Sequence, residues 1–110
     1  MEIVMPRGDL RVIQFGVSSH GVPYTDLDEI YFTVKKSVAS KTVNMQKKLS
    51  TGDIVLIDDK FQFTIMPEDT DNLEYGRYVF DIEVVKTGVI KETSVGSLTL
   101  TSEVTFADDE

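Results

Sequence analysis

Apolar and polar residues alternate along much of this chain with a period of two. In the segment 29–35, the apolar residues Ile30, Phe32 and Val34 are separated by residues that carry a polar group. Because successive side chains of a β-strand point to opposite faces, this alternation predicts a strand with one buried face. Three further segments share the pattern, and their predicted inward residues are Phe61, Phe63 and Ile65; Tyr78, Phe80, Ile82 and Val84; and Leu98, Leu100, Val104 and Phe106.

Shorter segments predict additional strands. Segments 43–49 and 54–57 predict two short strands. Segment 10–15 is apolar on both parities, which predicts a bulge or a strand covered on two sides. The two aspartates at 58–59 predict a tight hairpin, because aspartate tolerates the positive φ that such turns need. Gly96 lies inside a long final segment and predicts a bulge or bend.

One stretch departs from the strand pattern. Pro67 is suited to a first helical position, and Glu68 and Asp69 follow where a helix N-terminus favours acids. No other segment has an apolar period of 3.6 residues. The sequence therefore predicts an all-β, immunoglobulin-like antiparallel sandwich of seven to eight strands, with one helical turn near residues 67–73 and a single domain over residues 1–110.

The residues after this turn have the spacing of a tyrosine corner. In that corner a turn crosses between the sheets, and a tyrosine hydroxyl returns to backbone groups just upstream. Gly76 lies two positions before Tyr78, Phe80 stands where antibody domains carry a cysteine, and Leu73 is expected to plug the end of the sandwich. The alternative is an ordinary hairpin in which the Gly-x-Tyr spacing has no special role.

Other short motifs flank the corner in a defined order. They are Arg7-Gly8-Asp9, Gly21-Val22-Pro23, Met45-Gln46-Lys47-Lys48, Pro67-Glu68-Asp69-Thr70, Phe80-Asp81-Ile82 and Glu103-Val104-Thr105. Over residues 7–106 this order resembles the immunoglobulin-like domains of bacteriophage tail and baseplate proteins, such as the N-terminal domain of siphophage upper baseplate proteins. Those proteins have further segments after this domain, and receptor binding usually needs those segments. The resemblance therefore implies a virion or prophage structural component rather than a receptor-binding one.

The same resemblance implies partners and a location. It implies docking to other tail or baseplate proteins, or to copies of the same chain in a homo-oligomer. Synthesis in the host cytoplasm and a place in the virion would follow.

Composition narrows the classes of function. The net charge of −8 opposes contact with nucleic acid and with anionic membrane surfaces. The chain has no cysteine for a disulfide or thiolate site, and no apolar run near the roughly 18–20 residues that span a bilayer. Residues 1–6 lack the basic start and apolar core of a signal peptide. We therefore expect neither nucleic acid nor membrane as a partner.

The sequence also lacks the arrangements of residues that catalysis usually needs. The one histidine, His20, follows Ser19 directly in a turn-like segment, and a base adjacent in sequence rarely reaches triad geometry. All seven glycines are isolated, so there is no glycine-rich phosphate loop. We expect no catalytic residue, no cofactor and no enzymatic activity.

Clustered acids raise the question of calcium. Segments 26–29 and 69–71 each offer carboxylates to a cation that takes roughly six to eight oxygen ligands. The calcium-loop pattern fails at Leu73 and Glu74, and capping of the helical turn or of loop amides explains the acids more simply. The sequence therefore predicts no metal site, and a calcium-assisted carbohydrate or cell-surface binding module is the alternative function.

Three tyrosines are the candidate interface residues: Tyr24, Tyr31 and Tyr75. Tyrosine combines a large contact area with a polar tip and is enriched at interfaces. Tyr31 lies on the outward parity of segment 29–35, although it can equally pack on a neighbouring strand.

Overall fold

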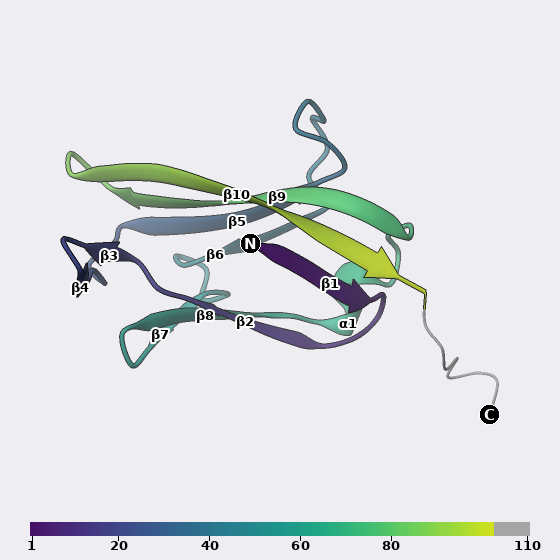
Figure 1. Ribbon diagram of the computed structural model, residues 1–110, viewed down its shortest axis with the longest axis horizontal. Helices are drawn as coiled ribbons and strands as arrows, with labels where there is room; N and C mark the ends of the chain where they lie inside the picture. The colour runs from purple at the N-terminus through teal and green to yellow at the C-terminus, as the bar shows by residue number, and fades with distance from the viewer. Residues whose placement is uncertain (103–110) are drawn as a thin grey trace.

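The computed structural model describes residues 1–102, which form a β-sandwich (Figure 1). The larger sheet has the strand order β1-β10-β9-β5-β6, with β1 (Glu2–Pro6), β10 (Ile90–Thr101), β9 (Gly76–Lys86), β5 (Glu29–Lys35) and β6 (Met45–Lys48). The facing sheet has the order β2-β8-β7, with β2 (Arg11–Phe15), β8 (Lys60–Ile65) and β7 (Val55–Ile57). The predicted all-β sandwich is confirmed.

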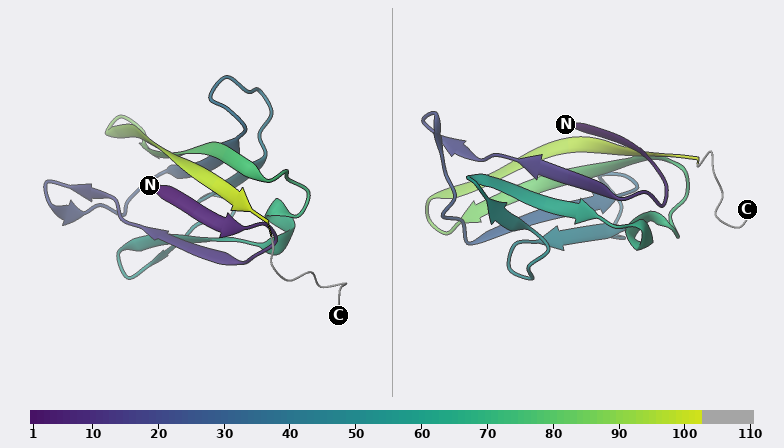
Figure 2. Two further views of the ribbon diagram at one scale, coloured as in Figure 1. Left: turned by 45° about the vertical axis from the view of Figure 1, so that its right-hand side comes forward. Right: turned by 90° about the horizontal axis from the view of Figure 1, so that it is seen from below.

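The two ends of the sandwich are built differently (Figure 2). A small hairpin of β3 (Ser18–Ser19) and β4 (Val22–Pro23) projects at one end, where the sequence indicated only a turn. The predicted helical turn is α1 (Pro67–Thr70) at the other end, with the proline in its first turn as expected. Val104 and Phe106, predicted to continue the last strand inward, lie outside the described residues.

The strand order matches the immunoglobulin arrangement, in which consecutive strands exchange between the two sheets. One pairing differs from the antiparallel expectation, because β1 runs parallel to β10, from Glu2↔Ser97 to Pro6↔Thr101. After β1 the chain crosses into β2 of the facing sheet instead of turning back in a hairpin, so no tight turn imposes antiparallel pairing. The sequence analysis assigned no strand to residues 2–6, although Ile3 and Met5 are 3% and 1% exposed.

The buried side chains join the two sheets in one cluster. The ring of Phe32 on β5 lies 4.4 Å from that of Phe63 on β8 and 5.1 Å from that of Phe80 on β9, centroid to centroid. The inward residues predicted within the described strands are all buried: Ile30, Phe32, Val34, Phe61, Phe63, Ile65, Tyr78, Phe80, Ile82, Val84, Leu98 and Leu100.

The prediction for segment 10–15 is wrong. Its pairing with β8 is continuous from Arg11↔Ile65 to Phe15↔Phe61, so β2 has no bulge. Leu10 and Val12 are 56% and 49% exposed, so the strand is not covered on both sides.

The two predicted turn positions behave differently. Asp58 and Asp59 have φ of 48° and 66° between β7 and β8, which confirms the tight hairpin. Gly96 pairs directly with Phe80 in an unbroken register, so the predicted bulge or bend is wrong. A Cβ at Gly96 would come under 3.0 Å from the Phe80 ring and the Met1 carbonyl oxygen, which explains the glycine.

The tyrosine corner is confirmed. The hydroxyl of Tyr78 donates a hydrogen bond of 2.9 Å to the carbonyl oxygen of Glu74, four residues upstream. Leu73 packs partly buried against the core, as expected for a residue at the sandwich end. Gly76 has φ of 121°, a backbone conformation that residues other than glycine rarely adopt.

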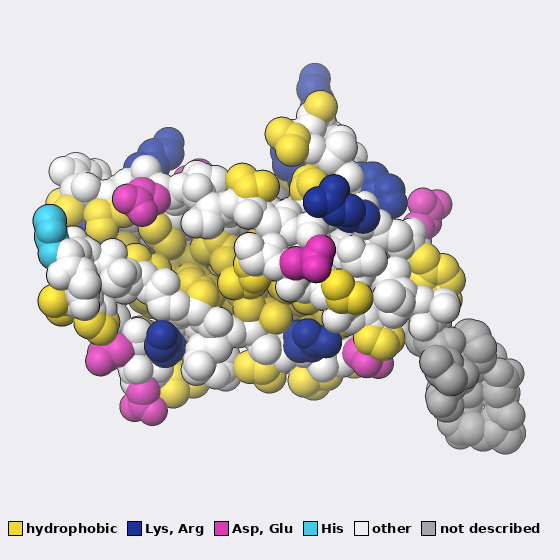
Figure 3. Space-filling model, viewed as in Figure 1, with side chains coloured by type: hydrophobic (Ala, Val, Ile, Leu, Met, Phe, Trp, Pro, Cys, Tyr) yellow, Lys and Arg dark blue, Asp and Glu magenta, His cyan; other side chains and the backbone are white. Residues whose placement is uncertain are grey.

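On one side the sandwich is open between β10 and β2. Seen from this side, apolar side chains of the interior are visible between the two layers (Figure 3). The N-terminus lies beside this opening, because β1 covers only the last part of β10.

Candidate docking face

The outward side chains of the larger sheet form a continuous face that no described strand covers. Its strands alternate inward and outward residues, and on β5 and β9 the odd-numbered residues point outward. We call this surface the outer sheet face and define it by Tyr31, Thr33, Lys35, Gln46, Lys48, Val79, Asp81, Glu83 and Val95.

Tyr31 lies in the middle of one row across this face. It pairs with Lys48 of β6 on one side and with Glu83 of β9 on the other. The Lys48 ammonium lies 5.7 Å from the centroid of the Tyr31 ring, and the tyrosine is half-buried by its neighbours. Tyr31 therefore points outward, as its parity predicted, and also packs on an adjacent strand.

A second row combines an acid with an exposed apolar residue. Thr33 accepts a 3.1 Å hydrogen bond from the Gln46 amide and pairs with Asp81, which pairs in turn with Val95. Burial raises the pKa of Asp81, Glu83 raises it further, and Lys35 opposes both. An acid that is already partly desolvated loses less hydration when a partner covers it.

Beside this row is a shallow hollow of about 90 Å³. It is lined by Asp81, Val79 and Val38, among other residues. Val38 belongs to the loop 36–44, which projects from the sandwich between β5 and β6 (Figure 1). Val38 and Val95 are 78% and 66% exposed. Sequence reasoning missed both valines. For Val95 the available signal was an apolar residue on the outward parity of its strand, whereas Val38 lies in a loop and had no such signal.

The three candidate tyrosines do not form one surface. Tyr24 follows β4 at one end of the sandwich, where its N–H bonds the Val17 carbonyl oxygen at 2.8 Å. Tyr75 precedes β9 at the opposite end, with the Arg7 guanidinium 4.2 Å above its ring. Only Tyr31 lies on the outer sheet face.

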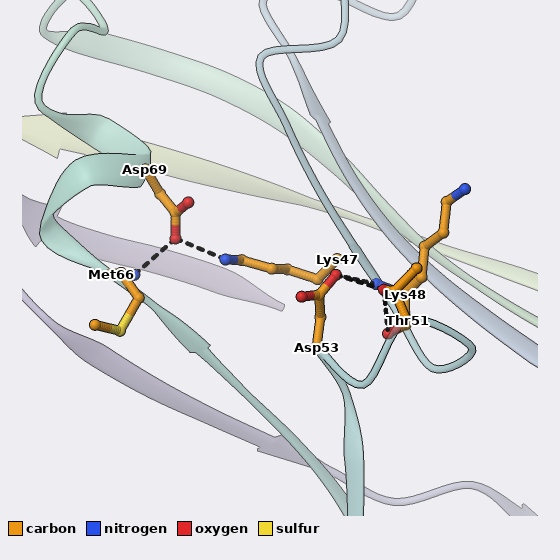
Figure 4. Close-up of polar contacts among 6 residues, drawn as sticks. All are labelled: Lys47, Lys48, Thr51, Asp53, Met66 and Asp69. Carbon is orange, nitrogen blue, oxygen red and sulfur yellow. Dashed lines mark hydrogen bonds and ion pairs between the residues drawn. The ribbon is translucent and has the colours of Figure 1, made fainter.

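Asp69 has a structural role at the end of the sandwich where α1 lies (Figure 4). One carboxylate oxygen accepts 2.7 Å hydrogen bonds from the Met66 N–H and from the Lys47 ammonium. The Met66 contact caps the helical turn, and the Lys47 contact links that turn to β6 of the larger sheet. The simpler interpretation of Asp69, as a capping residue, is confirmed.

The other loop acids also hold backbone groups. Asp28 accepts the Thr87 N–H at 2.8 Å, which lowers its pKa, and Lys86 adds to this effect. Burial alone would raise the pKa of Glu29, but hydrogen bonds, chiefly from Ser50 at 2.9 Å, lower it overall.

Asp53 acts in the same way beside β6. The Thr51 hydroxyl donates to it at 2.7 Å and lowers its pKa, with a further bond from the Lys48 N–H (Figure 4). Within residues 1–102, no three histidine, cysteine, aspartate or glutamate side chains gather as a metal site.

Two other features of the described chain are plain. His20 is exposed at the tip of the β3–β4 hairpin, with φ of 53°. None of the helices in residues 1–102 has the length and apolar character to cross a membrane.

The chain has structural likenesses among solved proteins. The chain matches no protein-family model and no curated protein. A solved structure of a proposed glycoside hydrolase from Bacteroides vulgatus is similar with a TM-score of 0.48 and 10% identity, over 92% of this chain. This chain spans 17% of that protein's length.

Proposed function

We propose that this chain is a structural docking module of a phage or prophage virion, a tail or baseplate component that acts through protein–protein contact. The outer sheet face carries the proposal. It joins an amphipathic tyrosine, the exposed Val95 and charges of both signs on one side of the larger sheet, with the exposed Val38 of loop 36–44 beside it. The motif order that resembles tail and baseplate domains supports the choice of assembly.

The charge distribution favours a second copy of the chain as one occupant. Lys35 and Lys48 lie on the same face as Asp81 and Glu83, so a two-fold arrangement can bring opposite charges together. The exposed Val95 would lose its contact with water in the same step. A tail or baseplate partner with a complementary face is the other occupant.

The test is light scattering on a size-exclusion column over a tenfold concentration range. We expect a concentration-dependent oligomer that Val95→Lys and Tyr31→Ala weaken without unfolding the domain. Val89→Lys is the matched control, because Val89 is 65% exposed in the β9–β10 turn and Val95 is 66% exposed on the face. Equal loss in both lysine variants would argue against the outer sheet face.

The calcium-assisted binding module receives less support. Asp28, Glu29, Asp53 and Asp69 already hold backbone amides or lysines. Repeating the chromatography with calcium and with chelator separates the two functions. A calcium-dependent change in the elution or melting of the protein would favour the alternative.

A further inference from the structure

A groove opens into the interior between the two sheets, on the side away from the outer sheet face. Its volume is about 420 Å³. It is lined by Met1, Phe15, Val17, Ile82, Val84 and Glu92, among other residues. A concave site lined by apolar side chains with a few polar groups is a common form of binding site. Figure 3 shows the apolar side chains at its floor.

One wall of the groove carries unpaired main-chain groups. The Ser97 N–H donates to the Met1 carbonyl oxygen at 3.2 Å, and the Thr101 carbonyl oxygen accepts from the Arg7 N–H at 3.0 Å. Backbone groups of alternate strand residues point to the same edge, so those of Thr93 and Val95 also point toward the β1 side. The pairing with β1 covers only Ser97 to Thr101, and no described strand pairs with this edge of β10 at Thr93 and Val95.

The opposite wall is a second open edge. β2 pairs with β8 on one side and with no described strand on the other. Between the two edges, the inward side chains of Ile82 and Val84 each stay 7% exposed, and Phe15 is half-buried. The groove therefore combines an apolar floor with strand edges on both sides, a shape that suits an extended chain better than a compact ligand.

We propose that this groove accepts an extended segment of a partner polypeptide as an added β-strand. The segment would continue the line of β1 along β10, bond the main-chain groups of Thr93 and Val95, and place apolar side chains at alternate positions over Ile82 and Val84. Glu92 is the ionisable side chain in the lining, and the chain carries a net charge of −8, so the segment is neutral or basic. The inference is independent of the outer sheet face.

A synthetic peptide tests the proposal on the intact chain. The probe is a seven-residue peptide with valine at alternate positions, threonine between the valines and lysine at both ends. We expect saturating peptide to slow amide hydrogen exchange of Thr93 and Val95 at least tenfold, because both N–H groups become bonded. A peptide of the same composition with adjacent valines should give no such protection.

Two variants at one position sharpen the test. Thr93→Pro removes an N–H that points to the open edge and leaves the β9–β10 hydrogen bonds in place, so the domain should fold and lose peptide binding at least tenfold. Thr93→Ala keeps the N–H and should bind like the original chain. Unchanged binding by the proline variant, protection at the β6 or β7 edge instead, or no binding by the original chain would each overturn the proposal.

Discussion

At the scale of single residues, Gly96 shows how closely the larger sheet packs. The edge of the Phe80 ring and the backbone of Met1 occupy the space where a side chain would begin. Neither neighbour is the tip of a flexible side chain. Phe80 packs against Phe32 in the aromatic cluster, and the Met1 carbonyl oxygen accepts a hydrogen bond from the Ser97 N–H. A methyl group at residue 96 can be accommodated only if the core or the start of β1 moves.

We therefore expect Gly96→Ala to lower the free energy of unfolding by about 1–3 kcal/mol, the usual range for overpacking. Urea denaturation followed by tyrosine fluorescence measures this change. Ser94→Ala, at an exposed position of the same strand, is the control and should stay within about 0.5 kcal/mol of the original chain. A Gly96→Ala variant as stable as this control would show that the neighbours yield freely.

Tyr78 provides a second test at this scale. Tyr78→Phe removes the hydrogen bond to Glu74 and should cost about 1 kcal/mol at neutral pH. Burial raises the pKa of the Tyr78 phenol above 10.0, so the unfolded chain loses this proton at a lower pH than the folded one. The stability that Tyr78 contributes is therefore lost as pH rises through the folded pKa.

Urea denaturation at about pH 8 and about pH 11 checks both effects. The original chain should lose stability between these conditions, and Tyr78→Phe should lose less. An equal alkaline loss in both chains would assign the effect to other groups.

At the scale of elements, α1 and the tyrosine corner hold the closed end of the sandwich. Thr70, which is fully buried in α1, accepts the Gly8 N–H at 2.8 Å and so ties the β1–β2 connection to the helical turn. Asp69 ties the same turn to β6 through Lys47, with side chains that are 21% and 13% exposed. A four-residue helix has too few internal hydrogen bonds to persist alone, so these contacts define it.

Asp69→Ala should consequently lower the free energy of unfolding by about 1–2 kcal/mol, because it leaves the Met66 N–H and a shielded lysine without their acceptor. Thermal unfolding followed by circular dichroism measures the loss. Asp71→Ala is the matched control, since Asp71 is exposed and its side chain makes no hydrogen bond to residues 1–102. Similar melting of the two variants would contradict the linking role of Asp69.

The strands show what a period-two pattern can predict. The alternation around Phe32, Phe63 and Phe80 correctly indicates which face is buried, because parity alone decides it. It does not specify pairing partners, so the parallel β1 and the unbroken register at Gly96 were beyond it. The tyrosine corner could be predicted because its hydrogen bond is local, four residues apart.

The candidate site was less accessible to sequence reasoning. Parity correctly placed Tyr31 on the outer face of its strand. Tyr24 and Tyr75 lie at opposite ends because loop paths, which no local pattern encodes, set their positions. The groove along β10 could not be foreseen either, since it depends on β1 pairing with only the part of β10 from Ser97 to Thr101.

At the scale of the whole molecule, the acids fall into two groups with opposite effects of pH. Asp28, Glu29 and Asp53 have lowered pKa values, so the stability they contribute is present at neutral pH and lost as pH falls through those values. The pKa of Asp81 is raised above 3.8, so the folded chain binds its proton more tightly and gains stability as pH falls. A declining negative charge, from −8 at pH 7, reduces self-repulsion in the same direction.

The balance predicts a melting temperature that rises as pH falls from 7 toward the raised pKa of Asp81. At still lower pH the melting temperature should fall, because Asp28, Glu29 and Asp53 become protonated at their lowered pKa values. Asp81→Asn should raise the free energy of unfolding at pH 7 by less than about 1 kcal/mol, with a higher melting temperature. It should also flatten the rise in melting temperature as pH falls from 7. Asp71→Asn removes the same charge at an exposed position and controls for net repulsion. If both variants flatten the profile equally, self-repulsion and not the local environment of Asp81 governs the acid response, and the outer sheet face holds no specially desolvated acid.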